Sequence, residues 1–577
     1  MLLALSVAGT ASCAPTPPSG RATAAVPSPS PTGQRPGGVL RLVYVAGSLG
    51  RGGTAVVPDP ALATTAAARQ ILRATSRQLV SYDPVDSLGD RQDPKPDLAT
   101  FPDISDDKTT FTFRLRDVRY PAPLDRPLRA ADVVHAVQRL CDPNAPSPGR
   151  ALFTRRIVGL ADFCTGLLAI GPGDPAAVAR YQGTHPIAGV TARDAHTIIF
   201  VVNAPAGDFL NALALPFVTP LPGEADTPAV VGLGPYVVAP GAGAVTTLVR
   251  SPSWQPDSDP LRRAWADRLE LRPVATAIAG AVEVAAGRAD LLLGGTSADE
   301  VRSAIPGAVP GAVPAADPRV RSTAAGVLDE LIARPGAGSP CGVALTDPRV
   351  RDAVALAADR RAAADAAGGP ELARPATSLL PAGVLGHGTT DVFATPGSAG
   401  DPVSARALLA AAVPAATPAA PLTCRLAVER ADPRLSAVGV ALRAPLRTVG
   451  LDLRPRRGGE RADLVLRRWT APWHGNSGRD LLEGLLAACP TVADGCYGGA
   501  GARAAAAAAL ELAAAENDQN RAAKRWAEAA VAVGAAVPVI PLVQERVVSL
   551  VGERVRGFRW FGLARDADPV NVAVPSP

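Results

Sequence analysis

The five histidines are the residues that could most directly support metal or acid–base chemistry, but their spacing indicates neither. Zinc and haem sites are built from clustered His and Cys ligands. No two of these histidines lie at helical ligand spacing or beside a CxxC pair. The histidines are His135, His185, His196, His387 and His474. We therefore predict that the protein has no metal site.

The short motifs that carry nucleotide and hydrolase chemistry are also missing from the sequence. There is no GxxxxGK[ST] loop, no GxGxxG after a strand and no GxSxG elbow. Asp480 and His474 could serve a secreted hydrolase, but no nucleophile, base and orienting residue form a recognisable set. We predict no catalytic residues and no cofactor, and a protein that is not an enzyme.

The seven cysteines indicate an oxidising compartment. Cys13 follows an apolar N-terminal run, and the other six cysteines are an even number that can form three bridges. Six cysteines allow fifteen pairings, and buried free thiols are the alternative. The predicted pairs are Cys141 with Cys164, Cys489 with Cys496 and, by elimination, Cys341 with Cys424.

The N-terminal residues 1–13, MLLALSVAGTASC, resemble the end of a bacterial lipoprotein signal peptide. The apolar run is too short to span a bilayer, and Cys13 would become the lipidated first residue of the mature chain. An ordinary secretory signal or a mis-assigned start is the alternative. Residues 14–36 are rich in Pro, Ser, Thr and Gly and predict a flexible tether between membrane and folded protein.

Composition predicts a folded protein of more than one lobe. The chain has 577 residues, 47% of them hydrophobic and 19% charged, whereas one domain usually spans about 100–200 residues. The net charge of +5 is spread along the chain. The densest basic cluster, residues 454–461, is interrupted by Pro455 and two glycines, which argues against a nucleic-acid-binding surface.

Hydrophobic periodicity predicts alternating strands and helices, and hence an α/β chain with mixed sheets. Alternating apolar residues indicate strands, and apolar residues three or four apart indicate helices. Asp347 is a predicted N-cap, with Pro348 at the first helical position. Strands are predicted over 110–116 and 196–203, an extended segment over 537–543, and helices over 130–140, 347–365 and 502–533.

Several segments, in this order, resemble the extracellular solute-binding proteins of family 5, which include oligopeptide-, dipeptide- and nickel-binding components of ABC importers. The resemblance lies in GGVLRLVY (37–44), ISDDKTTFTFRLRDVRY (104–120), LRAADVVHAVQRLCDP (128–143), TDPRVRDAVALAADR (346–360) and VPVIPLVQERVV (537–548). It implies a two-lobed, periplasmic-binding-protein-like fold of type II, with an extra inserted domain and a hinge between the lobes. By family position, lobe I comprises 37–78, 188–273 and 539–577, the inserted domain 79–187 and lobe II 274–538.

The resemblance also points to a ligand-binding loop at 467–482, RRWTAPWHGNSGRDLL. Peptide-binding relatives carry W-x-A-D-(Y/W) there, and the aspartate pairs with the free amino group of the ligand. Trp469, Ala471 and Trp473 match this pattern, but Pro472 takes the place of the aspartate. An unpaired ammonium in a desolvated cleft is costly. We therefore expect a ligand that either lacks a free N-terminal amine or presents it to another acid, which the sequence does not identify.

Four further residues are candidate ligand contacts, alongside Trp469 and Trp473. They are His474 on the same loop, Tyr82 after the crossing into the inserted domain, and Gly234 and Tyr236 in GLGPYVV. For each of the two tyrosines, a packed position at the end of a strand is the alternative. A ligand carboxylate could be bound by an arginine, but the sequence does not single one out.

The function implied by the resemblance is that of a monomeric, lipid-anchored, extracytoplasmic receptor. It would bind a peptide or peptide-like small solute and deliver it to the permease subunits and cytoplasmic ATPases of an ABC importer. The alternative is a surface solute sensor or interaction protein of the same fold without transport. Neighbouring permease genes would favour import, whereas a neighbouring kinase gene would favour sensing.

Overall fold

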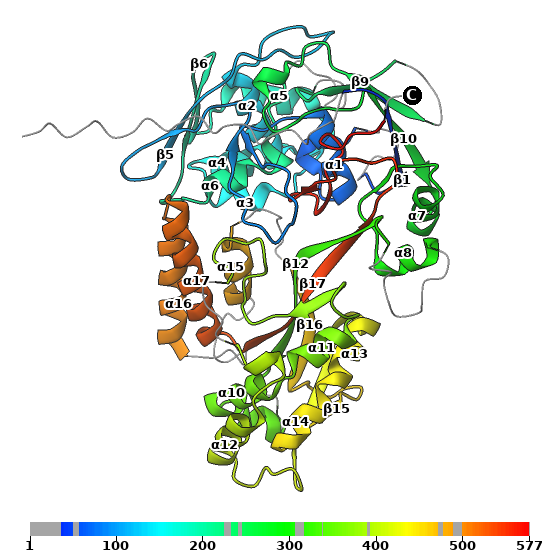
Figure 1. The fold of residues 1–577 in the computed structure, drawn as a ribbon. Coiled ribbons are helices and arrows are strands. Elements are labelled where there is room, and N and C mark those ends of the chain that lie inside the picture. Colours follow the sequence, from blue (N-terminus) through cyan, green and yellow to red (C-terminus); the bar gives the residue numbers. More distant parts are fainter. Residues whose placement is uncertain are drawn as a thin grey trace, which may run out of the picture.

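The computed structural model describes residues 36–49, 57–223, 232–240, 245–305, 317–336, 338–388, 393–470, 477–487 and 499–575. These residues form two lobes that are joined by two long strands, β12 (Val320–Ala333) and β17 (Val539–Leu550) (Figure 1). The inserted domain lies beside lobe I at the top of the view, and lobe II lies below. The predicted two-lobed α/β fold with mixed sheets is therefore confirmed.

Lobe I is built on a five-stranded sheet with the order β11-β1-β10-β9-β8. Strand β1 lies between β11 and the central strand β10 and is parallel to both, while β9 is antiparallel to β10 and β8. The strands are β1 (Val39–Val45), β8 (Tyr236–Val238), β9 (Thr246–Arg250), β10 (Arg268–Val274) and β11 (Leu291–Leu293), and the helices are α1 (Ala66–Thr75), α7 (Ala277–Ala285) and α8 (Ala298–Ala304).

The inserted domain carries a separate four-stranded antiparallel sheet with the order β4-β5-β7-β6. Alternate residues of β5 point into its core, where Phe111 packs on Phe209 and Phe113 packs on Phe200. Its strands are β4 (Asp103–Ile104), β5 (Thr110–Arg114), β6 (Val190–Asp194) and β7 (Thr197–Val201), and its helices are α2 (Ala130–Gln138), α3 (Arg150–Thr154), α4 (Leu160–Ala169), α5 (Pro175–Thr184) and α6 (Phe209–Leu213). The short pair β2 (Val80–Ser81) and β3 (Lys95–Pro96) precedes this sheet in the chain.

Lobe II contains a six-stranded mixed sheet with the order β13-β17-β12-β16-β14-β15. Helices cover this sheet, and the long helices α16 and α17 rise together toward the upper part of the molecule (Figure 1). The strands not yet given are β13 (Ala373–Pro375), β14 (Leu422–Val428), β15 (Leu451–Pro455) and β16 (Leu464–Thr470). The helices are α9 (Pro340–Ala344), α10 (Pro348–Ala357), α11 (Arg360–Ala366), α12 (Pro402–Ala412), α13 (Pro433–Ala441), α14 (Arg443–Val449), α15 (Arg479–Ala487), α16 (Gly499–Ala514) and α17 (Gln519–Ala536).

The C-terminal segment returns to lobe I and forms the small hairpin of β18 (Trp560–Phe561) and β19 (Asp566–Ala567). Gln70 of α1 donates a hydrogen bond to the carbonyl of Ala567, and Arg73 pairs with Asp568. The hairpin is thus fixed against α1, close to the strands that cross between the lobes.

Strand pairing crosses three of the predicted domain boundaries, and the boundaries themselves stay predictions. Strands β6 and β7 pair with β5 in the inserted domain, although residues 188–273 were assigned to lobe I. Strand β11 pairs with β1 in lobe I, although 274–538 was assigned to lobe II. Residues 539–543 pair within the lobe II sheet rather than lobe I. These memberships depend on pairing between distant segments, which local patterns do not encode.

Two predicted helices are each divided by a second N-cap. The region 347–365 begins as expected, with the Asp347 side chain accepting from Arg349 N, but Asp359 caps a new helix. The region 502–533 is divided where the Asp518 side chain accepts from Asn520 N and Arg521 N. A capping aspartate satisfies the free N–H groups that a helix start leaves, so each break costs little. The helix over 130–140 and the strands over 110–116 and 196–203 are confirmed to within a few residues.

Two of the three predicted disulfides lie in the described residues, and both are present. Cys141 is bonded to Cys164 within the inserted domain, with Cα atoms 5.1 Å apart. Cys341 is bonded to Cys424 in lobe II, with Cα atoms 5.2 Å apart. Cys489, Cys496 and Cys13 lie outside the described residues, so the third pair and the lipidation site stay predictions.

Candidate ligand-binding site between the lobes

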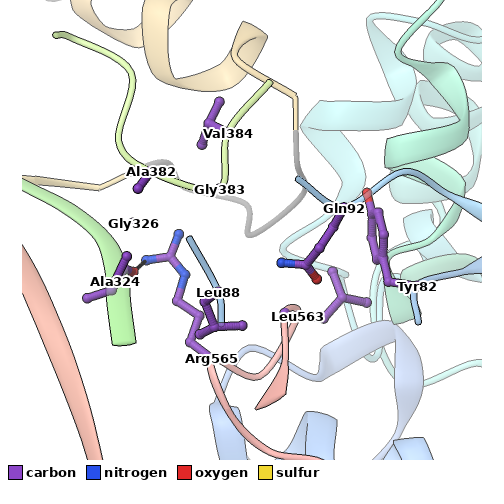
Figure 2. A pocket seen from close by; sticks show the side chains of 12 residues that line it. Tyr82, Leu88, Gln92, Ala324, Gly326, Ala382, Gly383, Val384, Leu563 and Arg565 are labelled. Atoms are coloured by element: carbon purple, nitrogen blue, oxygen red, sulfur yellow. Dashed lines mark hydrogen bonds between the residues drawn. The ribbon is translucent and has the colours of Figure 1, made fainter. Parts of the chain in front are cut away.

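A small cavity lies where the inserted domain, both lobes and the crossing strands meet, and we call it the interlobe cavity (Figure 2). Four separate stretches of chain form its walls. The lining residues are Tyr82, Leu88 and Gln92; Ala324, Ala325 and Gly326 of β12; Ala382, Gly383 and Val384 of lobe II; and Gly562, Leu563 and Arg565 of the C-terminal segment. Since both lobes contribute walls, any relative motion of the lobes changes its shape.

The interlobe cavity is small, and its lining is mostly apolar. Its volume is about 40 Å³, which suits one small chemical group rather than a whole drug-sized ligand. Among its lining residues no side chain is acidic and one, Arg565, is cationic. The described part of the chain contains no group of three or more His, Cys, Asp or Glu side chains that could hold a metal ion.

Arg565 is positioned by a tight turn between β18 and β19. Its φ of 53° is unusual for a residue with a side chain, and its backbone N–H bonds back to the carbonyl of Phe561 at 2.9 Å. The guanidinium donates from Nη1 to the carbonyl oxygen of Ala325. Figure 2 shows the side chains of Arg565 and Gln92 extending toward the cavity from different walls.

Gly326 provides the space in which this guanidinium lies. The register of β12 on β17 shifts between Ala324 and Leu328, so that residues 325–327 form a bulge. Gly326 has a φ of +65°, and a Cβ added there would lie 2.7 Å from Nη2 of Arg565. A glycine is needed here both for the backbone conformation and for the close approach.

Tyr82 is the predicted contact residue that lines the interlobe cavity. It is 2% exposed, and its hydroxyl oxygen accepts a hydrogen bond from Nδ2 of Asn211 at 3.1 Å. The ring therefore forms a fixed wall, positioned by the inserted domain. A direct contact between Tyr82 and a ligand stays a prediction.

Gly234 and Tyr236 do not line the interlobe cavity, and the structure gives both a packing role in lobe I. Tyr236 is fully buried, and its hydroxyl donates to the carbonyl of Ala266 at 2.7 Å. Gly234 lies against the end of α1, where an added Cβ would be 2.4 Å from the carbonyl carbon of Thr75. Direct contacts between these two residues and a ligand stay predictions.

Trp469 ends β16 and is half-buried against lobe II rather than in the interlobe cavity. The guanidinium carbon of Arg467 lies 4.5 Å from the centre of its ring, and a Cβ on Gly484 of α15 would lie 2.8 Å from Cζ2. Its Nε1 is buried, with no hydrogen-bond partner among the described residues. Pro472, Trp473 and His474 lie outside the described residues, so the ligand contacts predicted for this loop stay predictions.

A second set of contacts joins the lobes away from the crossing strands. Asp208 of the inserted domain lies 3.0 Å from Arg479 Nε of α15 and accepts a hydrogen bond from Ser477 Oγ at 3.1 Å. At the turn between α16 and α17, the Gly207 N–H donates to the carbonyl of Ala514, and Lys108 Nζ donates to that of Ala515. These contacts must rearrange when the lobes move apart.

Sequence reasoning missed Arg565 and Gln92, and it missed Gly326. An isolated glycine in the apolar run AAGVL of a strand is a signal for a bulge or a close approach, so Gly326 could have been found. Nothing in the local sequence separates Arg565 from the other arginines. Its role follows from its place beside a distant bulge.

A two-lobed α/β protein with a cavity at the lobe junction belongs to the class of hinged ligand-binding proteins. The chain is a member of the family described as bacterial extracellular solute-binding proteins, family 5, whose middle region matches residues 93–476. A search of curated protein sequences finds no match.

Solved structures with the same fold include several peptide-binding proteins. The clavulanic acid biosynthesis oligopeptide-binding protein 2 is 23% identical, with a TM-score of 0.71 over 95% of this chain and 97% of that one. The unliganded open form of the periplasmic murein tripeptide-binding protein MppA is 19% identical, with a TM-score of 0.67 over 94% and 99%. DppA of Helicobacter pylori in complex with the peptide STSA is 19% identical, with a TM-score of 0.55 over 94% and 98%.

Proposed function

We propose that this protein captures a peptide or peptide-like small solute between its lobes and delivers it to the permease of an ABC importer. The observation that carries the proposal is the cavity at the lobe junction of a family 5 solute-binding protein, with walls from both lobes and from the crossing strands. Closure of the lobes around a ligand converts binding energy into a shape that a permease can recognise. The protein acts as a monomer and performs no catalysis.

The ligand class is supported by the structural neighbours and by the sequence of the loop at 467–482. The neighbours bind oligopeptides, a murein tripeptide and the peptide STSA, as their descriptions state. The loop keeps Trp469 and Trp473 but has Pro472 in place of the acid that pairs with a peptide amine. We therefore propose that solutes with a blocked or absent N-terminal amine bind better than unmodified dipeptides.

Native mass spectrometry of the purified protein, followed by denaturing release, tests solute capture directly. A co-purified solute is expected, and calorimetric titration should show tighter binding of an N-acetylated peptide library than of its free-amine counterpart. Binding should reduce the radius of gyration in solution scattering and change tryptophan fluorescence. Tight binding of the free-amine library alone, lost on acetylation, would show that another carboxylate replaces the aspartate and would overturn the proposed preference.

We further propose that the protein is held at the outer face of the cell membrane by a lipid on Cys13. The described part of the chain has no helix that is both long and apolar enough to cross a bilayer. The apolar residues before Cys13 and the tether after it support a lipid anchor. A Cys13→Ala variant should move from the membrane fraction to the medium, while fractionation identical to wild type would exclude an anchor at this residue.

A further inference from the structure

Arg565 is half-buried and, unlike most of the buried arginines of this protein, has no carboxylate partner among the described residues. Among the described residues, no Asp or Glu oxygen lies within 4 Å of its guanidinium, and its one side-chain hydrogen bond goes to the carbonyl of Ala325. The negative charge of Glu545 favours the charged form of Arg565 from beyond ion-pair distance. However, Glu545 already forms ion pairs with Arg434 and Arg468. The cation therefore lies in the cavity wall without a counter-ion.

A second cation adds to the positive character of this wall. Arg69 of α1 is 5% exposed and donates from Nη1 to the carbonyl of Leu563, a residue that lines the interlobe cavity. It too has no carboxylate within 4 Å among the described residues. Burial lowers the pKa of Arg565, and the charge of Arg69 lowers it further. An anion in the cavity would be attracted by both guanidinium groups.

The size and lining of the cavity suit a carboxylate. A volume of about 40 Å³ accommodates a group of a few atoms. The unused N–H groups of a guanidinium form a planar fork that matches the two oxygens of a carboxylate. No acidic side chain in the lining would repel such a group.

We propose that Arg565 binds a carboxylate of the solute in the interlobe cavity, so that this protein selects acidic ligands. The inference rests on the proposed function, since it names the chemical class that the same site prefers. It agrees with the absence of an aspartate at Pro472, because the ligand then presents an acid to the protein instead of an amine. The carboxylate is either the C-terminus of a peptide or an acidic side chain.

The first experiment compares peptide acids with their amides. We titrate pools of N-acetylated tri- and tetrapeptides into wild type, Arg565→Gln and Arg565→Lys. The pools end either as free acids or as amides, and each kind is made with and without Asp and Glu residues. Arg556→Gln serves as the matched control, because Arg556 lies in the same C-terminal segment but is exposed, and within the described part of the chain its side chain bonds to the neighbouring carbonyls of Glu553 and Val555.

We expect wild type and Arg556→Gln to bind the acids at least about tenfold more tightly than the amides. Arg565→Gln should lose this preference, while Arg565→Lys should keep part of it as a point charge. Preference for Glu-containing amides over neutral acids would identify a side-chain carboxylate as the source. Two results together would overturn the proposal. Wild type would bind peptide acids and peptide amides without Asp or Glu equally well, and it would also bind amides with and without Asp or Glu equally well. An acid preference that survives in Arg565→Gln would also overturn it.

A second experiment separates this inference from the proposed function. If neither peptide pool binds wild type, the proposal of peptide capture is wrong. Saturation-transfer NMR with butyrate and butyramide still tests whether Arg565 binds a carboxylate. Butyrate should bind wild type and Arg556→Gln in preference to butyramide, and this difference should vanish in Arg565→Gln. If wild type does not distinguish butyrate from butyramide, Arg565 is not an anion-binding residue.

Discussion

Two arginine clusters, one with Arg77 and Arg262 and one with Arg565 and Arg69, illustrate opposite uses of the same side chain. In lobe I, Arg77 and Arg262 are fully buried and share two carboxylates, those of Asp97 and Asp259, over distances of 2.7–3.6 Å. In the wall of the interlobe cavity, Arg565 has, among the described residues, one carbonyl partner and no carboxylate partner. In the first cluster two buried arginines are neutralised by two buried aspartates, and loss of one partner would be destabilising. An arginine without a carboxylate partner lowers the stability of the protein unless an anion binds to it.

The pKa values of the two clusters follow the same division. Burial by itself would raise the pKa of Asp97, but the charges of Arg262 and Arg77 outweigh this and lower the pKa to about 2. Burial lowers the pKa of Arg565, the charge of Arg69 lowers it further, and the charge of Glu545 opposes this only in part. The first cluster stabilises the ionised forms of Asp97 and Arg262, whereas the second disfavours the ionised form of Arg565. Each of the following changes tests one side of this contrast.

The largest effect is expected for Asp97→Asn. It leaves two buried guanidinium groups with one carboxylate, which should lower the free energy of unfolding by about 3–5 kcal/mol in urea denaturation at pH 7. Because the folded-state pKa of Asp97 is lowered, its contribution is present above about pH 4 and is lost as the pH falls toward 2. The control is Asp125→Asn in the exposed pair with Arg119, for which a change under about 1 kcal/mol is expected. A similarly small effect for Asp97→Asn would contradict the structural role of the lobe I cluster.

An intermediate effect is expected for Glu330→Gln on β12. Glu330 is fully buried, and Arg467 bonds to its Oε2 at 3.2–3.3 Å while Oε1 has no partner among the described residues. Burial raises the pKa of Glu330 to about 7, and the charge of Arg467 opposes this only in part. Glu330 therefore binds its proton more strongly in the native state than in the unfolded state. The resulting contribution to the free energy of unfolding is present below about pH 4.5 and is lost as the pH rises through 7.

Glu330→Gln should remove that pH dependence. The loss of unfolding free energy between pH 4.5 and 8 should shrink by about 1–3 kcal/mol relative to wild type. Glu528→Gln, in an exposed pair with Arg525, should leave the slope unchanged. An unaltered slope in Glu330→Gln would show that Glu330 is ionised throughout this range.

The smallest effect on stability is expected for Arg565→Gln. Since the charge of Arg565 is uncompensated, a neutral side chain should leave the free energy of unfolding within about 1 kcal/mol of wild type or raise it. Arg262→Gln is the opposite control and should cost about 3–5 kcal/mol. Thermal and urea unfolding of both variants measure the difference. A loss in Arg565→Gln as large as that in Arg262→Gln would mean that the two arginines have the same structural role.

The candidate site was predictable only in part, and particular residues show why. Tyr82 was placed near the ligand by family position, and it lines the interlobe cavity. For Tyr236 the sequence left a ligand contact and a packed position open, and the structure shows Tyr236 and Gly234 packed in lobe I against Ala266 and Thr75. Short segments carry the family pattern, but which face of a segment meets the cleft depends on what packs behind it.

The sequence by itself determined the elements whose signals are local. Alternation identified β5, the N-cap Asp347 with Pro348 identified the start of α10, and the segments in family order identified a two-lobed solute-binding protein. Only the tertiary structure decided that β11 belongs to lobe I, that β12 bulges at Gly326, and that Arg565 meets this bulge. The physical reason is range: capping and periodicity act within a few residues, whereas the charge balance of a buried arginine depends on strands and turns hundreds of residues apart.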